Sequence, residues 1–364
     1  MGIWKECLLG DIITFQRGYD LPKTKMNGGI YPVVASNEII GYHNKFTTEE
    51  PSITIGRSGN VGKPLLIKGK SWSHNTTLYI KEYKNVAPLF IYYLLKTLDL
   101  KNYAGGSAVP TLNRNHIHCL PVKIPTDILI QKQIVSILSS YDNLIENNQK
   151  QIKLLEELAQ RLYKEWFVDL HFPDYENTPV VDGIPEGWQI GRLDELGEFK
   201  RGKTITKESV LEGDVPVVAG GLKPAYYHNI ANATAPVITV SGSGANAGFT
   251  RMYHIYVWAS DCSFVDINST NHIYQIYCYL KANKADLKRL QKGSAQPHVY
   301  AKDINAMQCL IPSDEISIHF NKFVSPIFTK IGKLYEQIEK LKETRDRLLP
   351  NLMNGEIDVS EIQI

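Results

Sequence analysis

The chain is an internal duplication, and this feature limits its fold more than any other. Trp4 is matched by Trp188, and GGSAVPTL at 105–112 is matched by KGSAQPHV at 292–299, at offsets of 184 and 187 residues. Because the offset drifts so little along the repeat, the two copies differ by short loop insertions alone. The two halves should therefore share one fold, with about 185 residues in each unit.

Both halves open with stretches that predict β-strands separated by glycine-rich turns. These stretches are rich in β-branched and aromatic residues. They lie at 11–15, 31–35 and 52–55 in the first half, and at 215–219, 237–240 and 255–259 in the second. A short helix is expected at 88–98, where Pro88 suits a first helical turn, and its counterpart is expected at 273–281.

Each half closes with a long helix whose apolar residues form a single seam. The seam residues are spaced alternately by four and three, which is the heptad pattern of a coiled coil. In the first helix they are Ile134, Leu138, Tyr141, Ile145, Asn148, Ile152, Leu155, Ala159, Leu162 and Trp166. In the second helix they are Phe320, Val324, Ile327, Ile331, Leu334, Ile338, Leu341, Arg345, Leu348 and Leu352, each 186 residues after its counterpart.

Four residues of these helices interrupt the regular helical pattern. Asn148 lies on the seam, where a polar side chain either fixes the register of the pair or frays towards solvent. Ser325 and Pro326 would suit a helix cap and first turn, so we expect a kink or a restart there. Pro350 should end or bend the second helix near its C-terminus.

Two amphipathic helices of this length can bury their seams against each other. If a pseudo-twofold axis relates the halves, the helices run antiparallel, and roughly 30 to 36 helical residues span about 45 to 54 Å. The expected fold class is α+β, with two tandem α/β domains in a pseudo-twofold repeat joined by two long antiparallel coiled-coil helices. Its parts are a first domain at 1–130, a first long helix at 131–168, an acidic linker at 169–187, a second domain at 188–312, a second long helix at 313–354 and a tail at 355–364.

Positive charge gathers in the two expected domains. Residues 1–130 carry 15 Lys and Arg against 9 Asp and Glu, and residues 188–312 carry 13 against 10, for net charges of +6 and +3. The linker at 169–187 carries five acidic residues and no Lys or Arg. Two basic modules separated by acidic chain are typical of a protein that binds a polyanion such as nucleic acid at two places.

The sequence lacks recognisable motifs for catalysis, metal binding and membrane insertion. GRSGNVGK at 56–63 departs from a P-loop, because Arg57 stands at the first glycine position and Pro64 at the Ser/Thr position. The five cysteines form no CxxC pair, so we expect reduced thiols and a cytoplasmic protein. No apolar run approaches the roughly 18 residues of a membrane helix. We therefore predict no catalytic residues, no metal and no cofactor on this chain.

The candidate binding residues are polar side chains on the repeated loops. Arg and Lys suit guanine edges and phosphates, Asn and Gln suit adenine edges, and Ser and Thr suit either. The first half offers Arg57, Ser58, Asn60, Lys63, Ser107, Thr111, Arg114 and Asn115. The second half offers Ser241, Ser243, Asn246, Arg251, Lys292, Ser294, Gln296 and His298. The glycine-rich loop at 56–63 is explained equally well as a tight structural turn without a binding role. The Gly-Ser-Ala-x-Pro residues are shared by the two halves, whereas the polar side chains around them differ. This is expected of two modules that have one scaffold and read different sequences.

For two histidines near these loops, a structural or solvent-exposed role is favoured over metal binding. His116 and His118 alternate as they would on one face of a strand. Their counterparts in the second half are Asp303 and Asn305, so the pair is not repeated as a set of metal ligands.

The order, duplication and spacing of these motifs resemble the specificity subunits of type I restriction–modification systems. The motifs are TIGRSGNVGKP, WSHNTTLY at 72–79, GGSAVPTLNRNHI and the helical stretch QKQIVSILSSYDNLIENNQKQIKLLEELAQRLYKEWF. The second copy repeats them more weakly, with Asp261 in place of Asn75 and a rewritten glycine-rich loop. The resemblance spans the chain from Trp4 to Gly355.

The resemblance implies a non-catalytic subunit with two target-recognition domains, each reading one half of a bipartite site in double-stranded DNA. It implies that the two helices set the spacing and that two methyltransferase subunits dock on them. Those subunits would bring S-adenosylmethionine and flip an adenine out of each half-site. In this family, two translocase/nuclease subunits that use ATP and Mg²⁺ can join the complex as further partners.

Two other classes of function stay open. One is a non-catalytic scaffold built on the coiled coil, which salt-sensitive duplex binding would argue against. The other is a standalone nuclease or methyltransferase, which activity of the purified chain alone would support.

Overall fold

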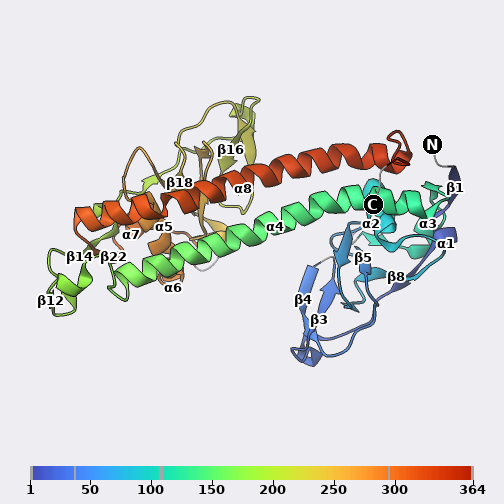
Figure 1. The fold of residues 1–364 in the computed structure, drawn as a ribbon, viewed down its shortest axis with the longest axis horizontal. Helices are drawn as coiled ribbons and strands as arrows, with labels where there is room; N and C mark the ends of the chain where they lie inside the picture. The colour runs from blue at the N-terminus through green and yellow to red at the C-terminus, as the bar shows by residue number, and fades with distance from the viewer. Residues whose placement is uncertain (1–2, 37, 106–109, 294–295, 362–364) are drawn as a thin grey trace. The chain divides into compact units, whose positions relative to one another are not determined.

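The computed structural model describes residues 3–36, 38–105, 110–293 and 296–361. The chain divides into two compact units, with Met1–Glu146 and Glu339–Ile364 in unit 1 and Asn147–Ile338 in unit 2. The two long helices are α4, Ile128–Phe167, and α8, Asp314–Asn354 (Figure 1). Each unit therefore holds a globular part together with one segment of each long helix.

The globular part of unit 1 combines small β-sheets with short helices. Its strands are β1 Trp4–Leu8, β2 Ile13–Arg17, β3 Tyr31–Ala35, β4 Glu38–His43, β5 Ser52–Gly56, β6 Pro64–Ile67, β7 Trp72–Ser73, β8 Thr77–Tyr83, β9 Ala104–Gly105, β10 Thr111–Leu112 and β11 Pro121–Pro125. Its short helices are α1 Leu9–Ile12, α2 Pro88–Thr97 and α3 Arg114–His118. The sheets have the orders β2-β8-β5-β6, β4-β3-β7, β1-β11 and β10-β9.

The globular part of unit 2 repeats this architecture. Its strands are β12 Val180–Val181, β13 Ile184–Pro185, β14 Gln189–Arg192, β15 Lys200–Arg201, β16 Val215–Val218, β17 Tyr226–His228, β18 Val237–Ser241, β19 Thr250–Tyr253, β20 Trp258–Ala259, β21 Cys262–Asp266 and β22 Gln308–Ile311. Its short helices are α5 Ile273–Ala282, α6 Lys284–Arg289 and α7 Ala301–Asn305. The orders β15-β21-β18-β19, β17-β16-β20 and β14-β22 match the first three sheets of unit 1, as the duplication predicts.

The repeat extends to side-chain packing around the three-stranded sheets. In unit 1 the His43 and Trp72 rings meet edge to face, with their centroids 5.1 Å apart. In unit 2 His228 and Trp258 meet in the same way at 5.1 Å. Each tryptophan lies on a short strand that pairs in parallel with the central strand of its sheet. The two halves therefore share local packing as well as topology.

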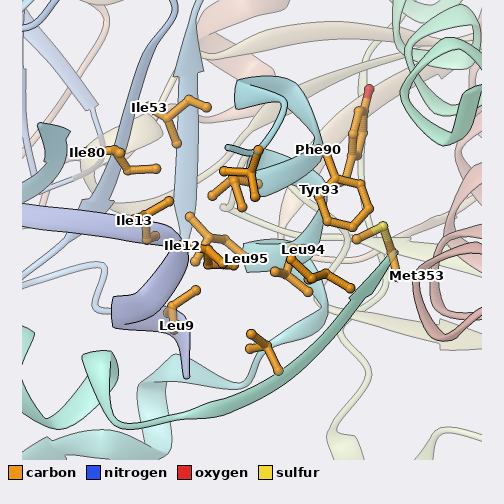
Figure 2. Packing of buried hydrophobic residues seen from close by; sticks show 14 of the residues in the cluster. Leu9, Ile12, Ile13, Ile53, Ile80, Phe90, Tyr93, Leu94, Leu95 and Met353 are labelled. Atoms are coloured by element: carbon orange, nitrogen blue, oxygen red, sulfur yellow. The ribbon is translucent and has the colours of Figure 1, made fainter. Parts of the chain in front are cut away.

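The core of unit 1 joins its globular part to both long helices. Buried side chains of α1, β2, β5 and α2 pack together with side chains of α4 and α8. Figure 2 shows Leu9, Ile13 and Leu95 within this cluster, and Met353 of α8 beside Leu94. Burial of this apolar surface fixes the globular part on its own pair of helical segments.

Within each unit the segments of α4 and α8 pack against each other. In unit 2 the Asn148 side chain donates a hydrogen bond to Gln337 Oε1 over 3.4 Å, while the Trp166 ring meets Phe320 at 5.4 Å. Residue numbers rise along α4 as they fall along α8, so these segments run antiparallel. Asn148 is buried and faces the other helix, which favours the register interpretation over a solvent-exposed fray.

In unit 1 the two helical segments are joined by an ion pair. Arg345 Nη1 donates to Asp142 Oδ1 over 2.5 Å, and Tyr93 of α2 donates its hydroxyl proton to Asp142 Oδ2 over 2.7 Å. Burial and the Asp142 carboxylate raise the pKa of Tyr93 above its ordinary value, so the phenol stays protonated and keeps donating.

The seam residues lie at the buried or half-buried positions of both helices. Those with least exposure are Ile134, Leu138, Ile145, Asn148, Ile152, Ile331, Leu334 and Ile338. Those half-buried are Tyr141, Leu155, Leu162, Ile327, Leu341 and Leu348. Several of them, including Ile134 and Leu138, bury against their globular part as well as against the other helix.

Two of the predicted strands are wrong in part. The stretch 11–15 begins with the end of α1, and β2 starts only at Ile13, because the Asp11 carboxylate accepts a hydrogen bond from the Leu8 N–H and closes a helical turn. The stretch 255–259 contains only the two residues of β20, and Ile255 and Tyr256 are exposed before it. Apolar residues in an exposed turn have the same sequence pattern as a short strand.

The predicted restart of the second helix is also wrong. α8 continues through Pro326 and through Pro350, and it ends at Asn354. Pro326 is exposed and lies between the fully buried Val324 and Phe328. These packed neighbours offset the loss of one backbone hydrogen bond, which a proline imposes on a helix.

The ends of the long helices are anchored by two equivalent tryptophans. In unit 1 the turn after α8 returns to Trp4, and a Cβ built at Gly355 would lie 2.6 Å from its indole. In unit 2 the Phe172 ring, just beyond α4, lies 4.6 Å from Trp188. The tail and the linker therefore play the same packing role in their respective units.

His254 in unit 2 is held against α8 and is half-buried. A Cβ at Gly332 would lie 2.9 Å from His254 Cβ, and the imidazole stacks on Tyr335 with 6.2 Å between centroids. Burial lowers the pKa of His254 to about 4. The folded protein therefore keeps this side chain neutral at pH values where an unfolded chain protonates it.

We expect the free energy of unfolding to fall as the pH decreases from about 6.5, the ordinary histidine pKa, towards 4. His254 should account for up to about 3 kcal/mol of this loss, because one pKa unit corresponds to about 1.4 kcal/mol. Urea unfolding of the wild type and of His254→Gln at pH 7.5 and pH 4.5 measures this loss of unfolding free energy. His171→Gln, at an exposed histidine, is the control. Equal losses in wild type and His254→Gln would contradict this assignment.

Candidate nucleic-acid interface

Three chain segments of unit 1 meet at one end of its four-stranded sheet. β2 and β5 both run antiparallel to β8, which lies between them, so their last residues lie beside the first residue of β8. Arg17 ends β2, the loop from Arg57 to Lys63 follows β5, and Asn75 precedes β8. We call these residues the loop edge of unit 1.

Unit 2 forms the equivalent loop edge from equivalent residues. Arg201 ends β15, the loop from Gly242 to Gly248 follows β18, and Asp261 precedes β21. The registers Arg201–Ser263 and Ser241–Cys262 place both flanking strands at the start of β21. The fold thus presents the same end of the same sheet twice, with different side chains on it.

The candidate residues Ser58 and Thr111 are brought together at the loop edge of unit 1. They form an antiparallel bridge, and the Leu112 N–H donates to the Arg57 carbonyl over 2.8 Å. Asn60 and Lys63 lie exposed on the same loop. Residues more than 50 positions apart in sequence thereby form one surface.

Arg114 and Asn115 are not joined to this loop in the same way. Both are exposed on α3, where the Asn113 side chain accepts a hydrogen bond from the Asn115 N–H as an N-cap. α3 packs against α1 and β2. Ser107 lies outside the described residues.

At this loop edge two arginines converge on one carbonyl. Arg17 Nε donates to the Asn75 carbonyl over 3.4 Å, and Arg57 Nη1 donates to the same oxygen over 3.5 Å. Burial lowers the pKa of Arg57, and the neighbouring charge of Arg17 lowers it further. Within the described residues, neither guanidinium forms an ion pair.

Arg17 and Asn75 were not among the candidate residues. The signal for Arg17 was present in the sequence, since Arg17-Gly18 recurs as Arg201-Gly202. The tight packing of Gly18 explains the repeat, because a Cβ there would lie 2.1 Å from the His74 carbonyl oxygen. The glycine lets the end of β2 approach the turn that carries Asn75.

In unit 2 the same bridge joins Ser243 and His298. These residues form an antiparallel bridge, and the Val299 N–H donates to the Gly242 carbonyl over 3.1 Å. Lys292 pairs with His298 through backbone hydrogen bonds of 2.8 and 2.9 Å, and its ammonium contacts Asp303 of α7 at 2.7 Å. Three candidates are thus grouped as their counterparts are in unit 1.

Three other candidates of unit 2 hold the loop that follows β16. Ser241 Oγ and Asn246 Nδ2 both donate to the Gly220 carbonyl, over 3.1 and 3.4 Å. Arg251 Nη1 donates to the Leu222 carbonyl over 3.3 Å, and its guanidinium lies 4.7 Å from the Tyr253 ring centre. These side chains are engaged in supporting the loop edge.

The other two candidates of unit 2 are Gln296 and Ser294. Gln296 is exposed beside the Ser243–His298 bridge. Ser294 lies outside the described residues.

The loop edges differ most at the position that precedes β8 and β21. In unit 1 the Asn75 amide donates to Asp20 Oδ1 over 2.6 Å. In unit 2 the residue is Asp261, whose Oδ2 accepts a hydrogen bond from Ser243 Oγ. The edge of unit 1 therefore presents the two cations Arg17 and Arg57, whereas the edge of unit 2 keeps one cation, Arg201, and adds the Asp261 carboxylate.

His118 and its counterpart have a structural role, but the strand predicted for His116 and His118 is wrong. Both histidines lie in α3, and His118 Nε2 accepts a hydrogen bond from the Phe15 N–H over 3.0 Å. In unit 2, Asn305 Oδ1 accepts the same bond from the Phe199 N–H over 2.8 Å. Burial lowers the pKa of His118, which favours the neutral ring that can accept this bond.

All five cysteines are free thiols. In the described ranges, no three His, Cys, Asp or Glu side chains gather as a metal site would require. No helix of these ranges has both the length and the apolar character of a membrane span.

Comparisons with known proteins agree on one family. A family model described as the type I restriction modification DNA specificity domain matches residues 1–157 and 185–344. The MjaIX type I restriction enzyme specificity subunit of Methanocaldococcus jannaschii is 29% identical over 312 residues, covering 75% of this chain and 70% of that protein. A putative type I specificity subunit of Mycoplasma pneumoniae is 23% identical, covering 96% of each chain.

A solved structure extends the likeness to the fold. The crystal structure of the S subunit of a type I restriction–modification system from M. genitalium superposes with a TM-score of 0.64. It shares 20% sequence identity and covers 97% of this chain and 96% of its own.

Proposed function

The chain belongs to the family of type I restriction–modification DNA specificity domains, and we propose that it is the subunit that selects the DNA sequence for a multisubunit methyltransferase. Residues 1–130 would be the first target-recognition domain and residues 188–312 the second. The helices at 131–168 and 313–354, with the linker at 169–187 and the tail at 355–364, would hold the two domains for a bipartite site.

The observation that carries this proposal is the pair of equivalent loop edges. One topology places the bridges Ser58–Thr111 and Ser243–His298 at the same end of the same sheet in each unit. The scaffold is preserved while the polar groups on it change, from Arg57 and Asn75 to Gly242 and Asp261. Two modules with a common scaffold and different hydrogen-bonding groups suit a target made of two different half-sites.

The chemistry of the complex would reside in its partners. Two methyltransferase subunits would bring S-adenosylmethionine and flip the target adenine of each half-site into their active sites. Two translocase/nuclease subunits, if the system has them, would supply the steps that use ATP and Mg²⁺. This chain would bind double-stranded DNA and dock the partners as a non-catalytic subunit, in the cytoplasm where the DNA lies.

The test is co-expression of the chain with the methyltransferase encoded beside it, followed by mapping of methylated adenines across the host genome. We expect one bipartite motif with an unread gap of constant length, and no methylation by either protein alone. Duplex binding by the complex should weaken steeply with salt, because phosphate contacts release counterions. A contiguous motif, or methylation by the purified chain alone, would contradict the proposal.

A further inference from the structure

The two loop edges offer opposite hydrogen-bonding groups at the same place in the fold. In unit 1 the Arg17 and Arg57 guanidinium groups flank the Asn75 carbonyl, to which both donate. In unit 2 the residue equivalent to Arg57 is Gly242, and Asp261 replaces Asn75. The change from a donor to an acceptor thus involves two neighbouring positions of an otherwise repeated scaffold, in which Arg17 is retained as Arg201.

We propose that Arg57, supported by Arg17, reads the acceptor edge of a guanine in the first half-site, and that Asp261 reads an exocyclic amino group in the second. The inference rests on the proposed function and assigns specificity-determining residues to it. Guanine presents O6 and N7 as adjacent acceptors in the major groove, which a guanidinium fork matches with two hydrogen bonds. A carboxylate instead accepts from an amino group such as cytosine N4.

The environment of Arg57 suits a base contact. Two like charges at one carbonyl repel each other, and among the described residues no carboxylate pairs with either of them. The nearby Asp20 carboxylate is taken by the Asn75 amide at 2.6 Å. The half-buried Arg57 therefore has donor capacity left over, in a place where a hydrogen-bond acceptor from outside the protein would relieve the repulsion.

The environment of Asp261 suits a donor. Its Oδ2 accepts from Ser243 Oγ, and a Cβ built at Gly242 would lie 3.3 Å from its Oδ1. Glycine at 242 therefore leaves this carboxylate accessible without a side chain over it. Within the described residues Asp261 forms no ion pair, so the carboxylate keeps acceptor capacity for a ligand.

The comparison of the units decides between a base and a phosphate. Arg57 alone is compatible with either, because guanidinium groups bind phosphate as readily as guanine. A carboxylate at the equivalent place would repel a phosphate at short range. Because the two units share one fold, the same edge should face the same part of the duplex in both, and only base edges accept both an arginine and an aspartate there.

The experiment uses the full complex with the methyltransferase and two matched pairs of variants. Arg57→Gln is compared with Lys81→Gln, an exposed lysine further along β8, and Asp261→Asn is compared with the exposed Asp214→Asn. For each complex, the methylated motif is mapped and duplex affinity is measured against targets changed at single positions, at several salt concentrations. Arg57→Lys keeps the charge without the planar fork and is read in the same way.

We expect Arg57→Gln and Arg57→Lys to relax one guanine position of the first half-site, with discrimination falling roughly 5- to 150-fold and the second half-site unchanged. Asp261→Asn should relax or change one position of the second half-site alone. Both control variants should keep the wild-type motif. Co-purification with the methyltransferase and an unchanged unfolding midpoint show that each variant is folded.

Two results would overturn the inference. If Arg57→Gln weakens all sequences equally and lowers the salt slope by about one, the arginine contacts a phosphate instead. If either folded variant keeps the wild-type motif, its residue does not read a base. Both outcomes presuppose a bipartite wild-type motif, so they leave the proposed function standing, whereas a wild-type complex without such a motif would refute the function itself.

Discussion

Replacing residues 188–312 with the matching block of another family member should change one half of the methylated motif and leave the other half intact. The original target should lose methylation by about 10³-fold or more, since specific sites are bound at least that much more tightly than non-specific DNA. Replacing residues 1–130 should change the other half. Mapping of methylated adenines in cells that carry each chimaera measures both effects.

The structure explains why such blocks should be exchangeable. The first and last strands of each block pair with each other, as β1 with β11 and β14 with β22. The two ends of each block therefore lie side by side, and one junction joins the block to the rest of the chain. One contact between α5 and α8 does not depend on the side chains of α5. In it the Asn321 side chain of α8 accepts hydrogen bonds from the backbone N–H groups of Tyr274 and Gln275. A chimaera in which both halves of the motif change would refute independent reading.

Lengthening both long helices by one heptad should lengthen the unread gap of the DNA target. Insertion of seven residues between Glu146 and Asn147, and of seven between Ile338 and Glu339, adds about 10 Å to each helix, which corresponds to about three base pairs of duplex. These insertion points lie at the boundaries of the two units, so the packing inside each unit is preserved. The mapped motif should keep both half-sites and change only in spacing, or methylation should be lost if the partner subunits cannot follow.

A single insertion provides the control. Seven residues added to α4 alone lengthen one helix between the units and not the other, so the α4–α8 pairing cannot be kept in both units at once, and pairs such as Asn148 and Gln337 are lost in one of them. We expect this variant to lose assembly with the methyltransferase, as judged by co-purification. A doubly lengthened protein that methylates the original motif with the original gap would show that the helices do not set the spacing.

Much of the fold follows from local sequence patterns. β3, β5 and α2 lie where β-branched residues and Pro88 predict them, and the topology repeats as the duplication requires. The wrong predictions arise where a local pattern suits more than one structure, as at Asp11 and Ile255, or where distant packing overrides the pattern. Pro326 would break an isolated helix, but Val324 and Phe328 are buried on either side of it.

The candidate site, like the fold, was predicted only in part. Ser58 and Thr111, and likewise Ser243 and His298, were chosen for their chemistry on repeated loops, and the structure brings each pair together. Arg17 was passed over because nothing near it in the sequence shows that β2 ends beside Asn75.

The amino-acid sequence by itself determined the duplication, the periodic seams and the division of charge between the two domains, because these are properties of order and spacing along one chain. Only the tertiary structure decided which side chains share a surface. The convergence of Arg17 and Arg57 on one carbonyl, and the position of Asp261 beside Gly242, depend on strand register between segments that lie roughly 20 to 60 residues apart. Such registers are set by burial of the whole core, so no local pattern contains them.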